Sequence, residues 1–171
     1  MANKMMSPSE TIWWVPEGTA GWNPDAPSAA VLTPARNISC AIVSGYTLNP
    51  TDSDTDDTTS ICNGANTSDF TFYNYEANLT FFRETEGADA DNTSAYARAF
   101  EFFKNVDADG YLVRRMGYLE STPAAAGQEV SVFYVQSDYP QDVVPDDGGP
   151  IQMTVPFLPQ GKMVLNVDLV A

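Results

Sequence analysis

Carboxylates are the main chemical groups that this sequence offers. The chain has 23 Asp and Glu residues against eight Lys and Arg residues and no His, which gives a formal charge of −15 at pH 7. Histidine is the usual general base near neutral pH and the commonest transition-metal ligand, so its absence removes most hydrolase and zinc-enzyme mechanisms. No paired acid and base, nucleophile motif or phosphate-binding loop is legible in their place. We therefore expect a protein that is not an enzyme and holds no cofactor.

One short motif resembles the start of an EF-hand calcium loop. Its matching residues, at loop positions 1, 3, 5 and 6, are Asn105, Asp107, Asp109 and Gly110. Position 12 should be a bidentate glutamate and is Met116, and Arg114 and Arg115 would bring two cations to the place where the loop closes. We therefore predict a helix-to-strand turn here and no metal site.

The two cysteines, Cys40 and Cys62, could pair if neighbouring strands brought them together. The sequence shows no apolar signal-peptide core after Lys4 and no stretch long enough to span a bilayer, so the default expectation is the cytosol, without a membrane anchor. Because the cytosol is reducing, two buried thiols are favoured over a disulfide.

The N-terminal part of the chain combines prolines with large aromatic residues. Residues 1–36 hold five of the twelve prolines and all three tryptophans, Trp13, Trp14 and Trp22. Prolines remove backbone donors, so we expect an extended N-terminal arm over residues 1–35, followed by a folded domain over residues 36–171. The three tryptophans either cap the core of this domain or dock on another subunit, where aromatic anchors are enriched.

The rest of the sequence predicts many strands and one helix. Apolar residues at i, i+3, i+4 and i+7 predict a helix over 93–104. Alternation over 73–81 predicts a half-buried strand, and Phe70 and Phe72 lie on the opposite parity, which predicts a turn or bulge near Tyr73. Further strands are expected at 36–44, 111–119, 129–136, 151–157 and 162–170. The expected fold is mainly β with one helix (α+β): a β-sandwich flanked by a single α-helix.

Twelve of the acids fall into three groups in loop regions. These groups are Asp52, Asp54, Asp56 and Asp57; Glu84, Glu86, Asp89 and Asp91; and Asp138, Asp142, Asp146 and Asp147. They either only solvate the loops or place charge between subunits or toward a passing polyanion.

The order of several segments matches a family of viral proteins. The segments NYEANLTFFRE, FEFFKN, DADGYLVRRMG, AAGQEVSVFYVQ and FLPQGKMVLNVDLVA follow one another over residues 74–171. In this order they resemble the major tail tube proteins of long, non-contractile phage tails (siphoviruses), especially those of phages infecting actinobacteria. The resemblance covers roughly residues 36–171.

This resemblance implies a structural virion protein. Its homohexameric rings would stack into a tail tube, assembled in the host cytoplasm with tape measure, tail terminator and tail tip proteins. Residues 1–35 and about 45–60 would then contact other rings. DNA would pass through the lumen without specific binding, and an acidic lining would keep phosphates off the wall. Glu76 and Asp168, on the polar faces of their strands, are the candidate lumen acids.

Two other functions remain open from the sequence. A carbohydrate- or receptor-binding β-sandwich would use exposed aromatic residues, such as Tyr73, Tyr75 or Trp22, to stack on sugar rings. A head decoration protein is the third possibility.

Overall fold

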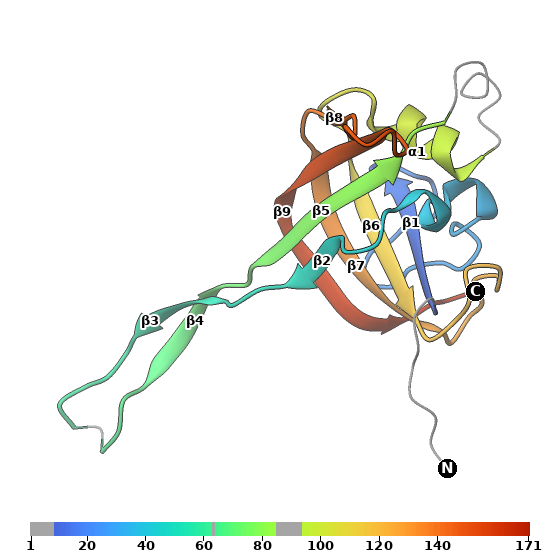
Figure 1. Ribbon diagram of the computed structural model, residues 1–171. Coiled ribbons are helices and arrows are strands. Elements are labelled where there is room, and N and C mark those ends of the chain that lie inside the picture. The colour runs from blue at the N-terminus through green and yellow to red at the C-terminus, as the bar shows by residue number, and fades with distance from the viewer. Residues whose placement is uncertain (1–8, 63, 85–93) are drawn as a thin grey trace, which may run out of the picture.

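The computed structural model describes residues 9–62, 64–84 and 94–171 (Figure 1). Seven antiparallel strands form one curved sheet in the order β1-β6-β7-β9-β5-β2, with β8 paired to β9, and β3 and β4 form a separate two-stranded ribbon. The strands are β1 (Glu10–Pro16), β2 (Thr47–Pro50), β3 (Asp54–Asp57), β4 (Ser68–Phe72), β5 (Tyr75–Phe82), β6 (Asp109–Met116), β7 (Glu129–Ser137), β8 (Gln141–Val143) and β9 (Gln152–Asp168). The other regular elements among the described residues are one α-helix, α1 (Ala95–Phe103), and two 3₁₀ turns, η1 (Pro34–Arg36) and η2 (Ser39–Ala41). The expectation of a mainly β chain with one helix is confirmed.

The sheet buries side chains on both of its faces. A larger core, with residues from β1, β2, β5, β6, β7, β9 and α1, fills the space that the curved sheet and the helix enclose. A smaller core on the other face joins Trp13, Val113 and Val132 to Leu32 from the segment after β1. The loops before η1 and after β6 therefore cover a face of the sheet that would otherwise be exposed to solvent.

Helix α1 closes the larger core. The side chain of Ser94 caps the helix by accepting a hydrogen bond from the backbone N–H of Ala97 at 3.0 Å. Asp91, Asn92 and Thr93, whose residue types also favour an N-cap position, lie outside the described residues. At the other end of the helix, the Phe103 ring meets the Trp14 ring at 4.9 Å between centroids. The apolar stripe expected from the sequence thus faces the sheet, with Ala99 and Phe103 fully buried.

Strand β9 corrects the expectation of two separate strands at 151–157 and 162–170. Pro159 and Gly161 interrupt the apolar pattern, but the chain continues as one strand of 17 residues. Its register against β7 shifts between Phe133 and Val135, so β9 accommodates its extra residues in a bulge. Gly161 has a φ of 76° in this bulge, and the proline is tolerated there because the regular ladder is interrupted.

The N-terminal segment also differs from the expected arm. Residues 10–16 form β1, an edge strand that pairs with β6 along its whole length. Successive residues of a strand point to opposite faces, so Trp14 enters the larger core and Trp13 the smaller one, each 2% exposed. The folded body of the protein, which is the curved sheet with the segments that cover it, therefore begins before residue 35. These two side chains are core residues of their own chain and not free subunit anchors.

Residues 36–44 correct another expectation, because they do not form a strand. They contain the last residue of η1 and the whole of η2, joined by Asn37 and Ile38. Ile38 is fully buried in the larger core, and its backbone N–H donates to the Ile12 carbonyl. The apolar residues of this segment therefore enter the larger core from a compact turn that packs against β1.

We expect Gly110→Ala to destabilise the body, because this position has no room for a side chain. A Cβ atom at Gly110 would lie 2.6 Å from the Val15 carbonyl oxygen and 2.7 Å from the Trp14 ring. The substitution should lower the free energy of unfolding by about 1–3 kcal/mol, measured by urea denaturation. Gly64→Ala is the matched control, since no heavy atom lies within 4 Å of a Cβ there. Equal stability of the two variants would contradict this close packing.

Candidate functional site

The β3–β4 ribbon is the most exposed apolar element of the described chain. It projects from the body in Figure 1, and every residue of both strands is exposed. Phe70, Phe72 and Tyr73 are 68%, 70% and 71% exposed, and Ile61, between the strands, is 105% exposed. A two-stranded hairpin is only marginally stable in water by itself, and exposed apolar groups mark interaction sites. The hairpin is therefore the leading candidate for a contact with another molecule.

The break between β4 and β5 explains how the ribbon leaves the body. Tyr73 and Asn74 separate the two strands, and the register of β4 against β3 shifts at Thr71, so the irregularity that the sequence predicts near Tyr73 is a bulge and a strand break. The Asn74 side chain donates to Asp54 Oδ1 at 3.1 Å, and the backbone carbonyl of Asn74 accepts from the Thr51 N–H at 2.9 Å. The partner strand Asp54–Asp57 was expected to be a loop, because aspartate has a low β propensity.

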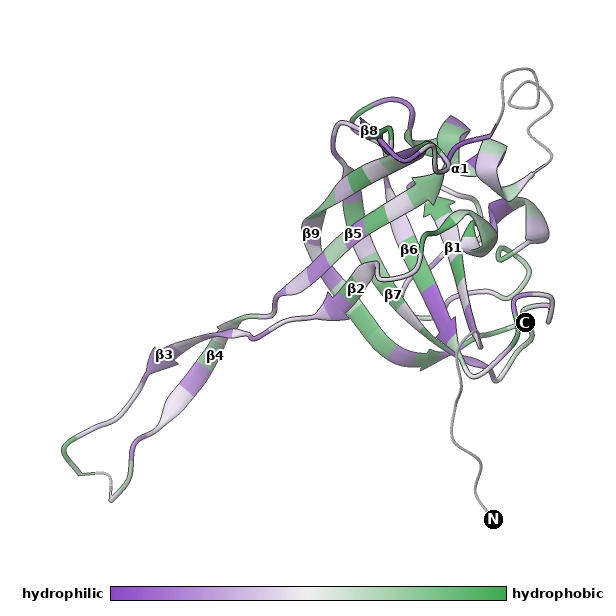
Figure 2. Ribbon diagram, in the orientation of Figure 1, coloured by the Kyte–Doolittle hydropathy of each residue, from purple (hydrophilic) through white to green (hydrophobic). Residues whose placement is uncertain are grey.

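The ribbon is acidic as well as aromatic. Figure 2 shows β3 as largely hydrophilic beside the more hydrophobic β4. Asp56 and Asp69 are directly paired across the two strands, where like charges repel each other. Hydrogen bonds from the Thr59 side chain and backbone lower the pKa of Asp57 below its usual value, which keeps that carboxylate charged. The ribbon therefore discourages contact with another acidic surface along its length.

A second surface is the outward polar face of β2, β5 and the first part of β9. It carries Glu76 among uncharged polar side chains: Thr47, Asn49, Asn78, Thr80, Gln152 and Thr154. Thr80 Oγ1 and Thr154 Oγ1 lie 2.9 Å apart and share a hydrogen bond. The alternate residues of β5, from Tyr75 to Phe81, are buried in the core. This face presents hydroxyl, amide and carboxylate groups to its surroundings.

The two acids singled out from the sequence do not share this face. Glu76 is the second residue of β5 and is paired with Asn49 of the edge strand β2. Asp168 is exposed at the far end of β9, directly opposite Glu129 of β7. The structure therefore places them on different parts of the sheet.

The aromatic residues proposed for sugar stacking are also separated. Tyr75 is buried at 5% exposure and its hydroxyl donates to the Tyr134 carbonyl, so it is not available to a ligand. Trp22 is half-buried and lies against the Tyr111 ring at 5.8 Å. Tyr73 is exposed, but on the ribbon. These three residues form no common platform.

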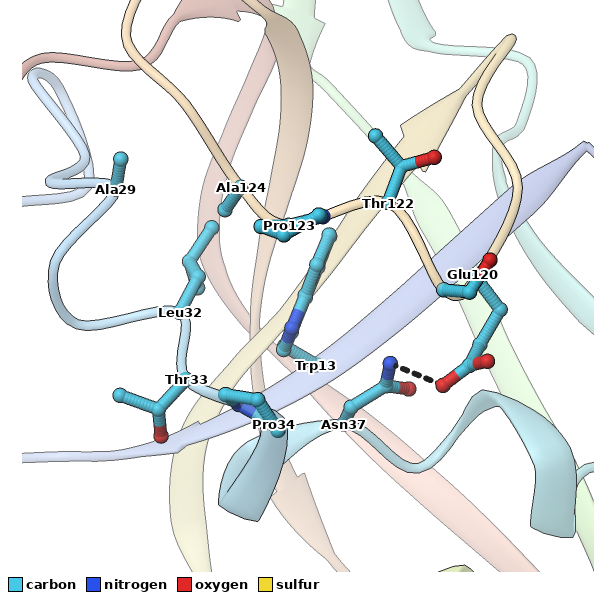
Figure 3. A pocket seen from close by; sticks show the side chains of 11 residues that line it. Trp13, Ala29, Leu32, Thr33, Pro34, Asn37, Glu120, Thr122, Pro123 and Ala124 are labelled. Carbon is cyan, nitrogen blue, oxygen red and sulfur yellow. Dashed lines mark hydrogen bonds between the residues drawn. The ribbon is translucent and has the colours of Figure 1, made fainter.

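A pocket of about 350 Å³ opens beside Trp13 (Figure 3). Its walls are mainly apolar and include Leu32, Pro34 and Pro123. At one end, the Asn37 side chain donates to Glu120 Oε1 at 2.8 Å, the dashed line in Figure 3. No local sequence pattern indicates this pocket, because its lining comes from β1, the segment around η1 and the loop after β6.

A buried arginine holds the loop that forms one wall of this pocket. Arg115 is fully buried, and its guanidinium donates to the carbonyls of Thr122 at 2.7 Å and Pro123 at 3.1 Å. It also donates to Gln128 Oε1 and to Thr11 Oγ1, while its Nε has no partner among the described atoms. Burial lowers the pKa of Arg115, but these acceptors hold the charged group in place. The pocket wall is therefore fixed from inside the sheet.

The cysteines correct the expectation of buried thiols. Cys40 and Cys62 are both free and both exposed. Cys40 follows Ser39 in η2. Although the residue is exposed, partial burial of its thiol raises the pKa of Cys40, and the nearby Glu120 carboxylate raises it further. Cys62 lies next to Ile61 between β3 and β4.

The motif at Asn105–Gly110 forms the connection between α1 and β6, as expected. Asp107 adopts a φ of 65° in this turn. Among the residues that the structure describes, no group of three or more metal-binding side chains comes together, and no helix is long and apolar enough to cross a membrane.

We expect Arg115→Lys to loosen the loop after β6. A lysine ammonium has no planar fork and cannot reach the acceptors on both sides, so the carbonyls of Thr122 and Pro123 lose their donors. Stability should fall by about 1–3 kcal/mol, and amide hydrogen exchange should rise over residues 117–128 more than in β7. Arg36→Lys, at a half-buried surface position, is the control. Unchanged exchange in the loop would contradict the role of Arg115.

A model of the family described as "Phage tail tube protein" matches residues 1–171 of this chain. No curated protein matches it. Because the family model covers the whole chain, the chain belongs to this family.

Proposed function

We propose that this member of the phage tail tube protein family forms homohexameric rings, and that the rings stack into a tube that conducts DNA into the host cell. Family membership makes the chain a structural component of the virion tail. The observation that carries the finer proposal is the exposed ribbon, whose aromatic side chains have no cover in the single chain. In a protein that assembles with copies of itself, a second copy is the natural cover.

The edges of the sheet support ring formation. β1 and β2 are the outermost strands of the curved sheet, and the outer side of β1 is already partly bonded, because Ile12 exchanges hydrogen bonds with Ile38 and Ser39. Edge strands carry backbone donors and acceptors that are unpaired on one side, and closure into a larger barrel removes such edges. We therefore propose that sheets of neighbouring subunits join around the lumen.

The polar face of β2, β5 and β9 is the best candidate for the lumen wall. Its own side chains include no cation, although Arg114, which is ion-paired with Glu10, donates to Asn49 of this face at 2.8 Å, and Glu76 adds one negative charge per subunit. Six copies in a ring would repeat this charge around the circumference, so DNA would not adhere. Asp168, beside Glu129, remains a second candidate at a different level of the sheet.

Other features of the proposal rest on the resemblance alone. It favours a long, non-contractile (siphovirus) tail, a host among the actinobacteria and assembly in the host cytoplasm. It also favours contacts with tape measure, tail terminator and tail tip proteins, and a purely structural role without catalysis.

Electron microscopy of the concentrated, purified chain tests the assembly proposal. We expect rings or tubes for the unmodified protein and a loss of tubes for the double variant Phe70→Asp, Phe72→Asp. Each exposed ring becomes a carboxylate on an already acidic ribbon, so the concentration needed for tubes should rise at least about tenfold, which is about 1.4 kcal/mol. The control, Phe70→Tyr with Phe72→Tyr, keeps both rings. Normal tubes from the aspartate variant would exclude the ribbon as an assembly contact.

The lumen proposal is tested in phage particles. We expect Glu76→Gln, Asp168→Asn and their combination to give tails of normal morphology but DNA ejection that is several-fold slower in vitro, because repulsion of phosphate weakens. Asp146→Asn removes the same charge from an exposed loop and is the control. Unchanged ejection kinetics in all three variants would reject both residues as the lining.

A further inference from the structure

The apex of the ribbon is uncharged, although the chain as a whole is strongly acidic. We define the apex as residues 58–62 and 64–67, which include no charged side chain. The acids of the ribbon, such as Asp57 and Asp69, flank this apex. Ile61 is 105% exposed, so it contacts almost nothing of its own chain. The apex is therefore the part of the ribbon that can approach an acidic surface without repulsion.

The Trp13 pocket has the complementary properties. Its volume of about 350 Å³ lies within the range of about 300–1,000 Å³ that is typical of ligand-binding pockets. Trp13, Leu32 and Pro123 make it apolar, while Glu120 at its rim disfavours an acidic ligand. The asparagine–glutamate bond and the contacts of Arg115 hold its walls before any partner binds. The pocket thus suits an uncharged, apolar projection.

We propose that the ribbon apex of one copy inserts Ile61 into the Trp13 pocket of a second copy. This inference rests on the proposed function, because it takes the partner of the ribbon to be the same chain. Each copy offers one apex and one pocket at different places, so the contact is heterologous. A heterologous contact leaves a free apex at one end and a free pocket at the other, which lets assembly propagate.

The two native cysteines provide a direct readout of this contact. Cys62 follows Ile61 in the apex, and Cys40 lies beside Glu120 at the pocket rim. Both thiols are exposed in the single chain. Insertion of Ile61 brings Cys62 of one copy toward Cys40 of the next.

The experiment is to oxidise assembled full-length protein, or treat it with a short bis-maleimide, and to map the linked peptides. We expect Cys40–Cys62 links and a ladder of multimers on a non-reducing gel, since every chain can be linked at both sites. Cys40→Ser and Cys62→Ser should each abolish the ladder, because a chain with one cysteine forms at most dimers. Tubes whose Cys62 forms no link to Cys40 would overturn the inference and leave the proposed function standing. Linked oligomers that never form rings or tubes would instead overturn the proposed function.

Two substitutions test the same contact without cross-linking of the cysteines. Ile61→Asp should raise the concentration needed for assembly at least about tenfold, and because Ile61 is exposed it should leave the melting temperature unchanged. Ala124→Phe, which fills the pocket, should have the same effect on assembly. Ile61→Leu and Ala126→Phe are the matched controls. The inference would be overturned if Ile61→Asp assembled at the same concentration as the unmodified protein. It would also be overturned if a zero-length cross-link joined Lys4 to Glu120, because the N-terminal segment would then occupy the pocket.

Discussion

The adjacent tryptophans of β1 are the constraint on which the body depends. Because successive strand residues face opposite ways, Trp14 and Trp13 bind one edge strand to both hydrophobic cores. The larger core requires α1, and the smaller core requires the loops around η1 and after β6. A sheet that is apolar on both faces must be covered on both, so this one dipeptide determines which segments the sheet has to recruit.

The covering of the second face also creates the pocket. The segment before η1 and the loop after β6 approach Trp13 from two sides, and their prolines leave room between them. Arg115 reaches through from β6 to hold the second of these segments. A buried cation with neutral acceptors is costly to replace, since its loss strands several carbonyls. The same contacts that complete the core therefore preorganise a binding surface.

The ribbon and the outer face of β2 and β5 differ in their charge. The ribbon concentrates carboxylates and aromatic rings on an element that the body does not stabilise, whereas the outer face of β2 and β5 is polar with a single carboxylate. An acidic excess keeps separate chains apart until apolar contacts outweigh repulsion. It also suits the proposed lumen wall, from which it would repel phosphate groups.

The sequence by itself determined the elements with a strong local period. The alternation in β5 and the apolar stripe of α1 are local patterns, and the structure shows both in Ala77, Leu79 and Phe81 and in Ala99 and Phe103. Tyr73 and Tyr96, which belong to the same patterns, are exposed. The order of several segments also indicates the family, which the family model over residues 1–171 confirms. That the protein is non-catalytic, as the absence of histidine suggests, stays a prediction.

Only the tertiary structure decided how β1, β9 and the pocket are built. Prolines near Trp13 predicted an arm, and the sequence patterns predicted two strands where β9 is continuous, but an edge position and a bulge accommodate the prolines. At the bulge, the Tyr75 hydroxyl accepts from the Gln160 N–H and donates to the Tyr134 carbonyl, a bridge between residues far apart in sequence. The burial of Arg115 and the Trp13 pocket likewise depend on segments about 100 residues apart. Local patterns carry no information about such contacts, because their free energy exists only after the chain has folded.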